Sequence, residues 1–249
     1  MLFHFSTLPL APYHNQFFTT QPINDMEFNL LLPGTRRSVD TFKEHHTKMH
    51  EPQTLSAKRM FDIIFALLVV ALLLSWLIPL VALIIKLESK GPALFKQLRT
   101  GKDNRPFYCF KFRSMQVNDE ANHKQASKGD ARITRVGAFI RKTNIDELPQ
   151  FINVLRGEMS IVGPRPHMLK HTEEYSQVVS DFMKRHTVTP GITGLAQVRG
   201  FRGETKETSA MAKRVRFDIW YIKNWSFLLD LKIVAMTVVQ AVKGHDNAF

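Results

Sequence analysis

The residues best suited to do chemistry are two adjacent carboxylates, Asp146 and Glu147, which follow the cations Arg141 and Lys142. Pro149 has no N–H to donate, so a helix that contains it must begin within a turn of it, with Asp146 as about its earliest N-cap. The carboxylates would then lie at the positive end of the helix dipole, where anions, including a bound phosphate group, are favoured. The competing interpretation is that the two acids merely cap the helix.

The helix itself is indicated by the spacing of its apolar residues. Leu148, Phe151, Ile152 and Leu155 fall at i, i+3, i+4 and i+7, which predicts a helix with one buried face. Gly157 follows at a position suited to a C-terminal cap. We therefore expect a short helix that ends before Gly157 and presents the carboxylates at its beginning.

A second group of basic residues lies on an expected strand. The stretch 107–115 has the composition of a strand that leads into a turn, and Lys111 and Arg113 would share one side of it. Together they could form a phosphate clamp, since lysine supplies a point charge and arginine a planar fork. Gly101 and the pair Asp103-Asn104 upstream indicate a turn, so we expect a short hairpin here.

One arginine is framed by two prolines, in Pro164-Arg165-Pro166. The prolines favour a rigid, extended loop, which would reduce the entropy lost when Arg165 presents its guanidinium to a phosphate. A purely structural turn is the alternative.

His167 and His171 are four residues apart, but no glutamate follows His167 as it does in zinc proteases. We interpret both histidines as helix-surface residues.

The most apolar stretch is 63–85, which has 23 residues and no charge. A membrane helix needs about 20 apolar residues, so we predict a membrane segment. Ser75 and Pro79 interrupt this stretch, and a proline kinks a helix by freeing backbone carbonyls. Basic residues flank both ends, namely Lys58, Arg59, Lys86 and Lys90. Because positive charge marks the cytoplasmic side, we favour a helix-break-helix hairpin that enters and leaves by one face, with a kinked single span as the alternative.

The composition limits the classes of function. The chain has 249 residues, a formal net charge of +12 and one cysteine, Cys109, which excludes a disulfide framework. Between residues 86 and 142 there are 14 basic and five acidic residues. Such a balance indicates a polyanionic partner, either nucleic acid, an anionic membrane surface or phosphorylated substrates. No readable nucleic-acid-binding module accompanies the charge, so we expect no nucleic-acid partner.

The remainder of the chain is predicted to be largely helical. Residues 171–187 have the pattern of an amphipathic helix, and residues 208–224 have that of another. The apolar face of the first would consist of Val178, Val179, Phe182 and Met183. The stretch Gly200-Phe-Arg-Gly203 is expected to be a loop with a basic residue at its tip.

The last apolar stretch, 225–242, contains Asp230 and Lys232. A charge at the centre of a membrane helix costs about 2.5–3.5 kcal/mol, so two of them argue against a second span. We expect instead a helix that packs on the body of the protein or lies in the membrane interface.

Taken in order, seven motifs resemble those of one known family. They are Lys58-Arg59 with Asp62, the apolar segment broken by Pro79, Gly91-Pro-Ala-Leu-Phe-Lys-Gln97, Lys111-Phe-Arg-Ser-Met115, Asp146-Glu-Leu-Pro-Gln150, Val162-Gly-Pro-Arg-Pro166 and Pro190-Gly-Ile-Thr-Gly-Leu-Ala-Gln-Val198. The chain resembles the bacterial sugar transferases that begin polysaccharide assembly, the monotopic polyprenyl-phosphate phosphoglycosyl transferases. The resemblance covers residues 58–249. Larger relatives carry several membrane spans and a further domain upstream, for which residues 1–57 are too few.

The resemblance implies an α/β membrane-associated fold. A re-entrant membrane helix hairpin would occupy residues 58–90, and amphipathic interfacial helices would surround a small α/β cytoplasmic catalytic domain at 91–249. Residues 1–57 would form a poorly patterned extension, and they carry no secretory signal. The protein would lie at the bacterial inner (cytoplasmic) membrane, in contact with membrane lipid, with its catalytic part facing the cytoplasm. A homodimer is left open.

The resemblance also implies a reaction, the transfer of a sugar 1-phosphate from a UDP-sugar to undecaprenyl phosphate with release of UMP. Asp146 would be the nucleophile that forms an aspartyl-phosphosugar intermediate, Glu147 would be its partner, and both would hold Mg²⁺ with the substrate phosphates. Residues that would bind the substrate phosphates are Lys111, Arg113, Arg141 and Arg165. The chemistry suits these residues, because Mg²⁺ and cations neutralise the phosphate that a carboxylate must attack.

The sugar is predicted from the C-terminal part. Arg199-Gly-Phe-Arg-Gly-Glu-Thr205 and Asp230-Leu-Lys-Ile233 resemble the glucose-1-phosphate transferases of exopolysaccharide pathways, so we expect UDP-glucose. UDP-galactose and N-acetylated sugars stay open, because a single hydroxyl contact can change specificity.

Two other classes of function compete with a transferase. One is a membrane-tethered Mg²⁺-dependent phosphatase or hydrolase, in which water replaces the lipid, and the other is a non-catalytic basic membrane adaptor.

Overall fold

A computed structural model describes residues 52–118, 126–127, 129–203 and 207–243 of the chain. The chain divides into two units, Met1–Arg37 and Ser38–Phe249, and every described residue belongs to the second. Most of the predicted extension at 1–57 therefore lies outside the described residues. Helix α2 (Pro52–Val69) begins within that extension, before the predicted membrane boundary at residue 58.

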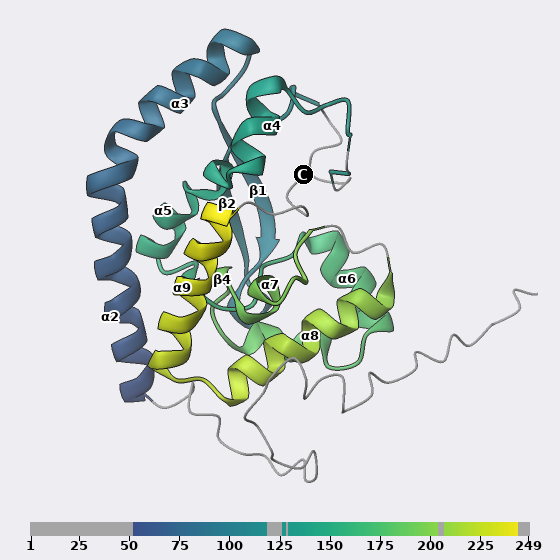
Figure 1. Ribbon diagram of the computed structural model, residues 1–249. Coiled ribbons are helices and arrows are strands. Elements are labelled where there is room, and N and C mark those ends of the chain that lie inside the picture. The colour runs from purple at the N-terminus through teal and green to yellow at the C-terminus, as the bar shows by residue number, and fades with distance from the viewer. Residues whose placement is uncertain (1–51, 119–125, 128, 204–206, 244–249) are drawn as a thin grey trace, which may run out of the picture. The chain divides into compact units, whose positions relative to one another are not determined.

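The apolar segment forms one long, bent helix (Figure 1). Helix α2 continues through a π-helical turn at Val70–Leu74 into helix α3 (Ser75–Glu88) without a loop. Among the described residues, this is the one helix long and apolar enough to cross a membrane, with 33 residues at Ser56–Glu88 and a mean hydropathy of 2.9 in its 18-residue apolar window. At 1.5 Å per residue, the helix is about 50 Å long.

The bend follows from the two residues predicted to break the helix. Pro79 cannot donate a hydrogen bond to the carbonyl of Ser75, and its ring crowds that carbonyl. Ser75 Oγ donates to Ala71 O at 2.8 Å, and Trp76 Nε1 donates to Leu72 O at 3.1 Å, so side chains engage carbonyls of the π-helical turn. The predicted break is thus a π-helical turn in a continuous helix, and not a loop between two helices.

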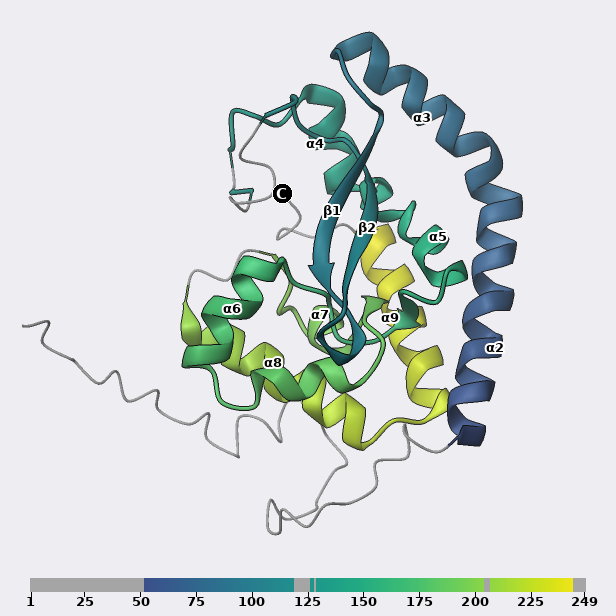
Figure 2. The same cartoon turned by 180° about the vertical axis from the view of Figure 1, so that it is seen from behind.

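The predicted β-hairpin is confirmed (Figure 2). Strand β1 (Leu94–Thr100) pairs antiparallel with β2 (Pro106–Phe112) over the full length of both strands. A 3-10 turn at Lys102–Asn104 joins them, with Asp103 and Asn104 in the left-handed region, which asparagine and aspartate tolerate better than most residues. This turn lies where the sequence indicated one.

A second pair of strands, β3 (Ser160–Val162) and β4 (Gly191–Thr193), is parallel. The backbones approach closely here, since a Cβ atom on Gly191 would lie 2.1 Å from the nitrogen of Gly163. Only glycine fits such an approach. The contact places the beginning of the loop that carries Arg165. The two small sheets and their helices confirm a mixed α/β fold.

Six further helices surround the strands in the described part of the chain. They are α4 (Arg135–Lys142), α5 (Gln150–Leu155), α6 (Leu169–Val178), α7 (Leu195–Val198), α8 (Thr208–Lys223) and α9 (Phe227–Lys243). Helix α8 packs on α7 and α6, while α9 packs on α7 and the two short strands. Figures 1 and 2 both show α2 and α3 running along one side of this body.

Both ends of the bent helix contact the same α/β body. Near its beginning, α2 packs on α5 and β3. Near its end, Ile85 of α3 lies in a buried cluster with Phe112 of β2. Between these contacts the helix presents large apolar side chains outward, with Leu72 74% and Trp76 53% exposed. The body therefore contacts the helix near both ends, and in the middle one side of the helix is uncovered while Leu74 is buried.

A buried ion pair attaches the beginning of α2 to α9. Lys58 Nζ lies 2.6 Å from Asp230 Oδ2. Tyr221 OH and Trp225 Nε1 also donate to the Asp230 carboxylate, at 2.6 and 3.1 Å. Asp230, which argued against a second membrane span, is thus fully buried against α2. The packed helix predicted for residues 225–242 is observed.

Two more residues of the same motif bind α2 to the body. Arg59 donates to the last two carbonyls of α5, the nearer at 2.6 Å. Asp62 accepts hydrogen bonds from Ser160 Oγ at 3.0 Å and from the Ile161 amide at 2.9 Å, both in β3. Lys58, Arg59 and Asp62 therefore anchor the helix to three separate elements.

The buried face of α5 differs from the prediction. Its four expected apolar residues are half-buried, whereas Gln150, Asn153 and Val154 are buried. The Asn153 amide bonds to the backbone of β2 at both its oxygen and its nitrogen. Phe151, on the apolar face, stacks on Phe65 of α2. The apolar face therefore meets the long bent helix and the polar face meets the β-hairpin. Gly157 follows the helix as its predicted cap.

The amphipathic helix predicted at 171–187 is also corrected. Helix α6 ends at Val178, and after the left-handed residue Asp181 a 3-10 segment follows (Phe182–Thr187). Of the expected apolar face, two residues are buried, but Val178 and Met183 are exposed. The change of direction at Asp181 takes the second half of the segment out of phase with the helical spacing.

Removing one partner of the buried Lys58–Asp230 pair should destabilise the fold. Lys58→Met leaves a buried carboxylate with only neutral donors, so the free energy of unfolding should fall by about 3 kcal/mol. Denaturation of the detergent-solubilised protein, followed by tryptophan fluorescence, measures this change. Lys232→Met, at an exposed position of α9, is the matched control and should cost less than about 0.5 kcal/mol. A loss no greater than that of the control would contradict the anchoring role.

Candidate active site

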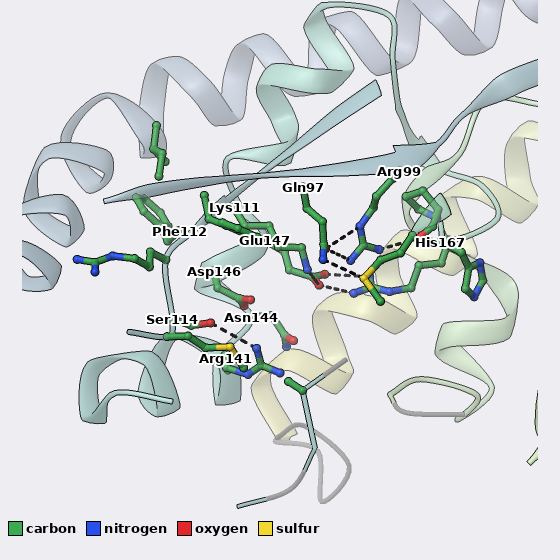
Figure 3. A pocket seen from close by; sticks show the side chains of 18 of the residues that line it. Gln97, Arg99, Lys111, Phe112, Ser114, Arg141, Asn144, Asp146, Glu147 and His167 are labelled. Carbon is green, nitrogen blue, oxygen red and sulfur yellow. Dashed lines mark hydrogen bonds and ion pairs between the residues drawn. The ribbon is translucent and has the colours of Figure 1, made fainter. Parts of the chain in front are cut away.

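A cavity of about 310 Å³ lies among the hairpin, the turn that carries Asp146 and Glu147, and the loops that follow β3 and α7 (Figure 3). Its lining includes both carboxylates. It also includes seven basic residues, namely Arg99, Lys111, Arg113, Arg141, Arg165, Arg202 and Arg214. Such an excess of positive charge favours a ligand with several negative charges.

The two carboxylates lie in a 3-10 turn, Ile145–Glu147, which comes just before helix α5 and is not its first turn. Asn144 precedes this turn in the left-handed conformation, and the Glu147 amide donates to its carbonyl at 3.2 Å. Helix α5 begins only at Gln150, and its N-cap is Pro149, with no capping side chain. The interpretation of the two acids as mere helix caps is therefore wrong.

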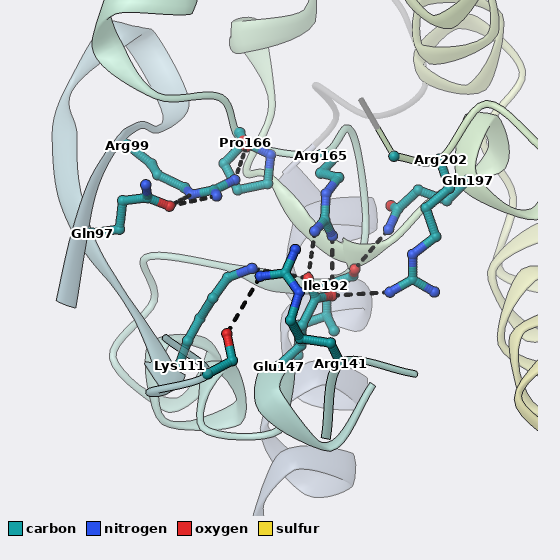
Figure 4. Close-up of polar contacts among 12 residues, drawn as sticks. Gln97, Arg99, Lys111, Arg141, Glu147, Arg165, Pro166, Ile192, Gln197 and Arg202 are labelled. Atoms are coloured by element: carbon teal, nitrogen blue, oxygen red, sulfur yellow. Dashed lines mark hydrogen bonds and ion pairs between the residues drawn. The ribbon is translucent and has the colours of Figure 1, made fainter. Parts of the chain in front are cut away.

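Three cations from three segments converge on Glu147 (Figure 4). Lys111 of β2 donates to Oε1 at 3.0 Å, Arg165 donates to both oxygens, with Oε2 at 3.1 Å, and Arg202 donates to Oε2 at 3.3 Å. Burial alone would raise the pKa of Glu147, but Arg165, Lys111 and Arg202 hold it well below its ordinary value. Glu147 is therefore an anion at neutral pH and serves as the common partner of the three cations.

Asp146 has the opposite surroundings. No hydrogen bond or ion pair within the described part of the chain engages its carboxylate, and Figure 3 shows it apart from the contacts of Glu147. Burial raises the pKa of Asp146, and the neighbouring Glu147 adds to the effect, while Lys111 and Arg141 oppose it. The carboxylate oxygens of Asp146 are thus available to a ligand in the cavity.

Three of the predicted phosphate contacts lie together. Lys111 and Arg165 meet at Glu147, although they are 54 residues apart in the sequence. Arg141, in the last turn of α4, lines the same cavity and donates to Ser114 Oγ at 3.3 Å. The hairpin, the loop after β3 and α4 therefore each supply a cation to one space.

Arg113 departs from the prediction. It borders the cavity, but its guanidinium donates to the carbonyls of Ser89 and Lys90 at 2.8 and 2.7 Å, where α3 ends. Strand β2 ends at Phe112, so the alternation that would place Arg113 beside Lys111 ends there as well. A clamp formed by this pair is therefore wrong, and Arg113 supports the end of the long helix.

Three arginines of the cavity, Arg99, Arg202 and Arg214, were not predicted as site residues. Arg202 had one signal in the sequence, its place at the tip of a loop between two glycines. Arg99 had none, because it is one of many basic residues between 86 and 142. The Arg99 guanidinium donates to Pro166 O and to Gln97 Oε1, both at 2.6 Å. Its partners are neutral, so Arg99 adds a positive charge to the cavity without a carboxylate of its own.

His167 is not the helix-surface residue expected from its spacing. It lies before α6 and is buried, with its Nδ1 against Arg185 and its Nε2 3.3 Å from Arg214. Burial lowers the pKa of His167 well below its ordinary value, and the charges of Arg185 and Arg214 lower it further. His167 is therefore a neutral ring between two guanidinium groups.

The comparison with known families decides the assignment. The family model described as bacterial sugar transferase matches residues 53–244, which include the bent helix and the whole lining of the cavity. The chain belongs to the bacterial sugar transferase family. The motifs that resembled this family are therefore family features, and the cavity that they surround is the candidate active site of a family member.

Similar sugar transferases include two with the same name, UDP-glucose:undecaprenyl-phosphate glucose-1-phosphate transferase. The one from Escherichia coli (strain K12) is 52% identical over 192 residues, which are 76% of this chain and 40% of that protein. The one from Caulobacter vibrioides is 48% identical over 193 residues, 77% of this chain and 72% of that protein. The exopolysaccharide production protein PSS of Rhizobium leguminosarum is 45% identical over 190 residues, 74% of this chain and 94% of that protein. The chain spans well under half the length of the first of these relatives.

The donor set of this sugar transferase can be compared with the needs of Mg²⁺. Among the described residues, no group of three or more His, Cys, Asp or Glu side chains is placed to hold a metal ion. Mg²⁺ commonly binds through one or two carboxylates, water and substrate phosphates, so it needs no such group. Asp146 fits this role because its oxygens accept from no described donor, whereas both oxygens of Glu147 already accept from cations.

The two carboxylates should have opposite effects on stability at pH 7. The pKa of Glu147 is lowered, so its ionised form stabilises the fold at neutral pH and this contribution is lost as the pH falls through its folded pKa. Asp146 has a raised pKa, so stability is lost as the pH rises through it. Glu147→Gln should therefore lower the free energy of unfolding by about 3 kcal/mol, while Asp146→Asn should raise the thermal midpoint. Thermal unfolding in detergent tests both, and changes of the same sign would contradict the assignment.

Proposed function

We propose that the chain transfers glucose 1-phosphate from UDP-glucose to undecaprenyl phosphate, releases UMP and so initiates exopolysaccharide or glycoconjugate synthesis. One observation carries the proposal. The buried carboxylate of Asp146 lines a strongly positive cavity and has no hydrogen-bond donor among the described residues, and it lies next to Glu147 with its three cations. Membership of the sugar transferase family and the names of its relatives support the same reaction.

In the first step, an Asp146 oxygen attacks the sugar-bearing phosphorus of the donor. A bond forms between that oxygen and phosphorus, and the bond from phosphorus to the bridging oxygen breaks. UMP leaves with the electron pair of the broken bond, and an aspartyl-phosphosugar remains. In the second step, an oxygen of undecaprenyl phosphate attacks the same phosphorus, and Asp146 leaves as a free carboxylate. Because Asp146 must be ionised to attack, its raised pKa predicts that turnover is lost as the pH falls.

The cations around the carboxylates make this attack feasible. A carboxylate and a diphosphate repel each other, so charge on the phosphate oxygens has to be neutralised before they meet. Glu147 holds Lys111, Arg165 and Arg202 at one edge of the cavity. Arg99 faces the same space with neutral partners only, so its charge is available to a phosphate oxygen.

Mg²⁺ is the proposed cofactor. Asp146 and the donor phosphates would hold it, with Glu147 contributing only if one of its cations moves away. When bound, Mg²⁺ would neutralise charge on the diphosphate and on the departing UMP. The family resemblance implied that both carboxylates hold the ion and left open how they divide it between them.

We also propose that the bent helix is re-entrant in the bacterial inner membrane, with the catalytic body on the cytoplasmic side. The hydrocarbon core of a bilayer is about 30 Å thick, so a single span would carry its two ends to opposite surfaces. Here Lys58 at one end and Ile85 at the other both contact the same body. The exposed middle of the helix, around Leu72, would then be the part that lies deepest in lipid.

An assay with purified protein tests the proposed function against its alternatives. Lipid-linked sugar together with UMP is expected from UDP-glucose, undecaprenyl phosphate and Mg²⁺. Free sugar phosphate without lipid product would indicate a hydrolase, and no turnover would indicate an adaptor. Parallel reactions with UDP-galactose and N-acetylated UDP-sugars show which sugar the protein transfers. Without the acceptor lipid, intact-protein mass should increase by one hexose phosphate.

Asp146→Asn should remove both the transfer and the mass increase. Because an amide is a poor nucleophile, we expect UMP release to fall by at least about 10³-fold. Asp181→Asn is the matched control, since Asp181 is exposed and asparagine tolerates its left-handed backbone. Membrane association should be the same in both variants. Turnover retained by Asp146→Asn would rule out this residue as the nucleophile.

Cysteine labelling can test the re-entrant arrangement. Cys109 is buried, so new cysteines can be read against a low background. Ser56→Cys and Lys90→Cys lie at the two ends of the bent helix, and a membrane-impermeant maleimide should label both from the cytoplasmic face in inverted vesicles. Leu72→Cys, in the middle, should resist labelling because thiolate formation is suppressed in lipid. Labelling of the two ends from opposite faces would establish a single span.

A further inference from the structure

One face of helix α8 is linked by hydrogen bonds to two loops of the active site. Arg214 and Asp218 are four residues apart on this helix, so their side chains share a face. Both are buried, and neither forms a hydrogen bond with Asp146 or Glu147. Arg214 bonds instead to the backbone of the segment that carries Arg202, and Asp218 pairs with Arg185, which bonds to the backbone of Arg165.

Arg214 holds the loop that presents Arg202. Its Nε donates to Phe201 O at 3.0 Å and its Nη2 donates to Gly203 O at 3.1 Å, so the guanidinium bonds to the residues on both sides of Arg202. Gly200 and Gly203 have φ values of +91° and +93°, in a region that glycine enters freely. Two glycines around one arginine give the loop many conformations, and these two hydrogen bonds select one of them.

Asp218 acts on the other arginine through Arg185. The Asp218 carboxylate lies 2.6 Å from Arg185 Nη2, with side chains that are 2% and 0% exposed. The same nitrogen donates to the carbonyl of Arg165 at 2.9 Å. A buried charge with one carboxylate partner has little freedom to move, so Asp218 restrains the backbone of Arg165 by way of Arg185.

His167 lies between the two arginines of these contacts, Arg214 and Arg185. Its ring lies between Arg185 and Arg214, with one nitrogen toward each guanidinium. A neutral ring keeps two buried cations apart without adding a third charge. The loop after β3, the loop after α7 and helix α8 therefore meet in one buried unit, behind the two arginines that contact Glu147.

We infer that Arg214 and Asp218 are positioning residues, which set where Arg202 and Arg165 present their guanidinium groups to Glu147 and to the diphosphate of the donor. The inference deepens the proposed function and rests on it for the donor. Both residues act at a distance from the reacting atoms. A displacement of about 1 Å in a group that contacts the transition state can reduce the rate by about a hundredfold, so this support matters for turnover.

A double-mutant cycle separates positioning from general stability. Arg214→Met removes the two donors to the loop but keeps the length of the side chain, and Arg202→Ala removes the guanidinium that the loop presents. Each should lower kcat/KM for UDP-glucose between about tenfold and a hundredfold. If Arg214 acts through Arg202, the double variant should lie within about twofold of Arg202→Ala alone. Multiplied losses in the double variant would overturn the inference.

Two variants on the same helix serve as references for this cycle. Arg216→Met makes the same change at a position that does not line the cavity, and it should leave kcat/KM within about twofold of the wild type. Arg214→Lys retains a cationic donor and should recover part of the activity that Arg214→Met loses. Equal activities of Arg214→Lys and Arg214→Met would show that donation to the loop carbonyls is unimportant.

Hydrogen exchange gives a readout that needs no activity. In Arg214→Met, amides of residues 199–203 should exchange several times faster, while those of the β1–β2 hairpin keep the wild-type rate. In Asp218→Asn, faster exchange should appear at residues 163–167. Unchanged exchange at both segments would overturn the inference, as would a uniform increase over the whole body. If the wild-type chain releases no UMP, the proposed function fails, yet these exchange rates still decide whether α8 positions the two loops.

Discussion

Glu147 draws one cation from each of three segments to a single pair of oxygen atoms. Lys111, Arg165 and Arg202 would repel one another at such distances without a central anion, so the place of each depends on this carboxylate. The preceding residue, Asp146, has no donor of its own within the described chain. Two adjacent acids thus differ in role because a 3-10 turn directs one toward the cations and leaves the other open to the cavity.

The same cavity depends on how the long helix is attached. Polar side chains in one turn of α2 bind α9, α5 and β3, and the end of α3 packs on β2, the strand that carries Lys111. The long apolar helix and the strand that lines the cavity are therefore parts of one packed unit. For a reaction between a soluble donor and a lipid-borne acceptor, as proposed, this connection would keep the cavity at a constant distance from the membrane.

Prediction from sequence succeeded where the signal was local. The hairpin followed from a turn at Asp103-Asn104 between apolar stretches, and the apolar segment was recognised from its length and lack of charge. Prediction failed where contacts with other segments of the chain decided the position of a side chain. Arg113 was expected beside Lys111, but the strand ends one residue too early and its guanidinium donates to two carbonyls just after α3. His167 was expected on a surface, but two arginines from distant segments enclose it.

By itself, the sequence determined the long apolar segment, the Asp146-Glu147 pair as the candidate for chemistry and most of the cations near it, because each is recorded in residue type and short-range spacing. Only the tertiary structure decided that Glu147 is the acid bound by cations and that Asp146 is the one left free. It also decided that Arg202 joins the site and that α8 supports it. The physical reason is that charge states in a buried site depend on distances among side chains from remote segments, and those distances exist only after the chain has folded.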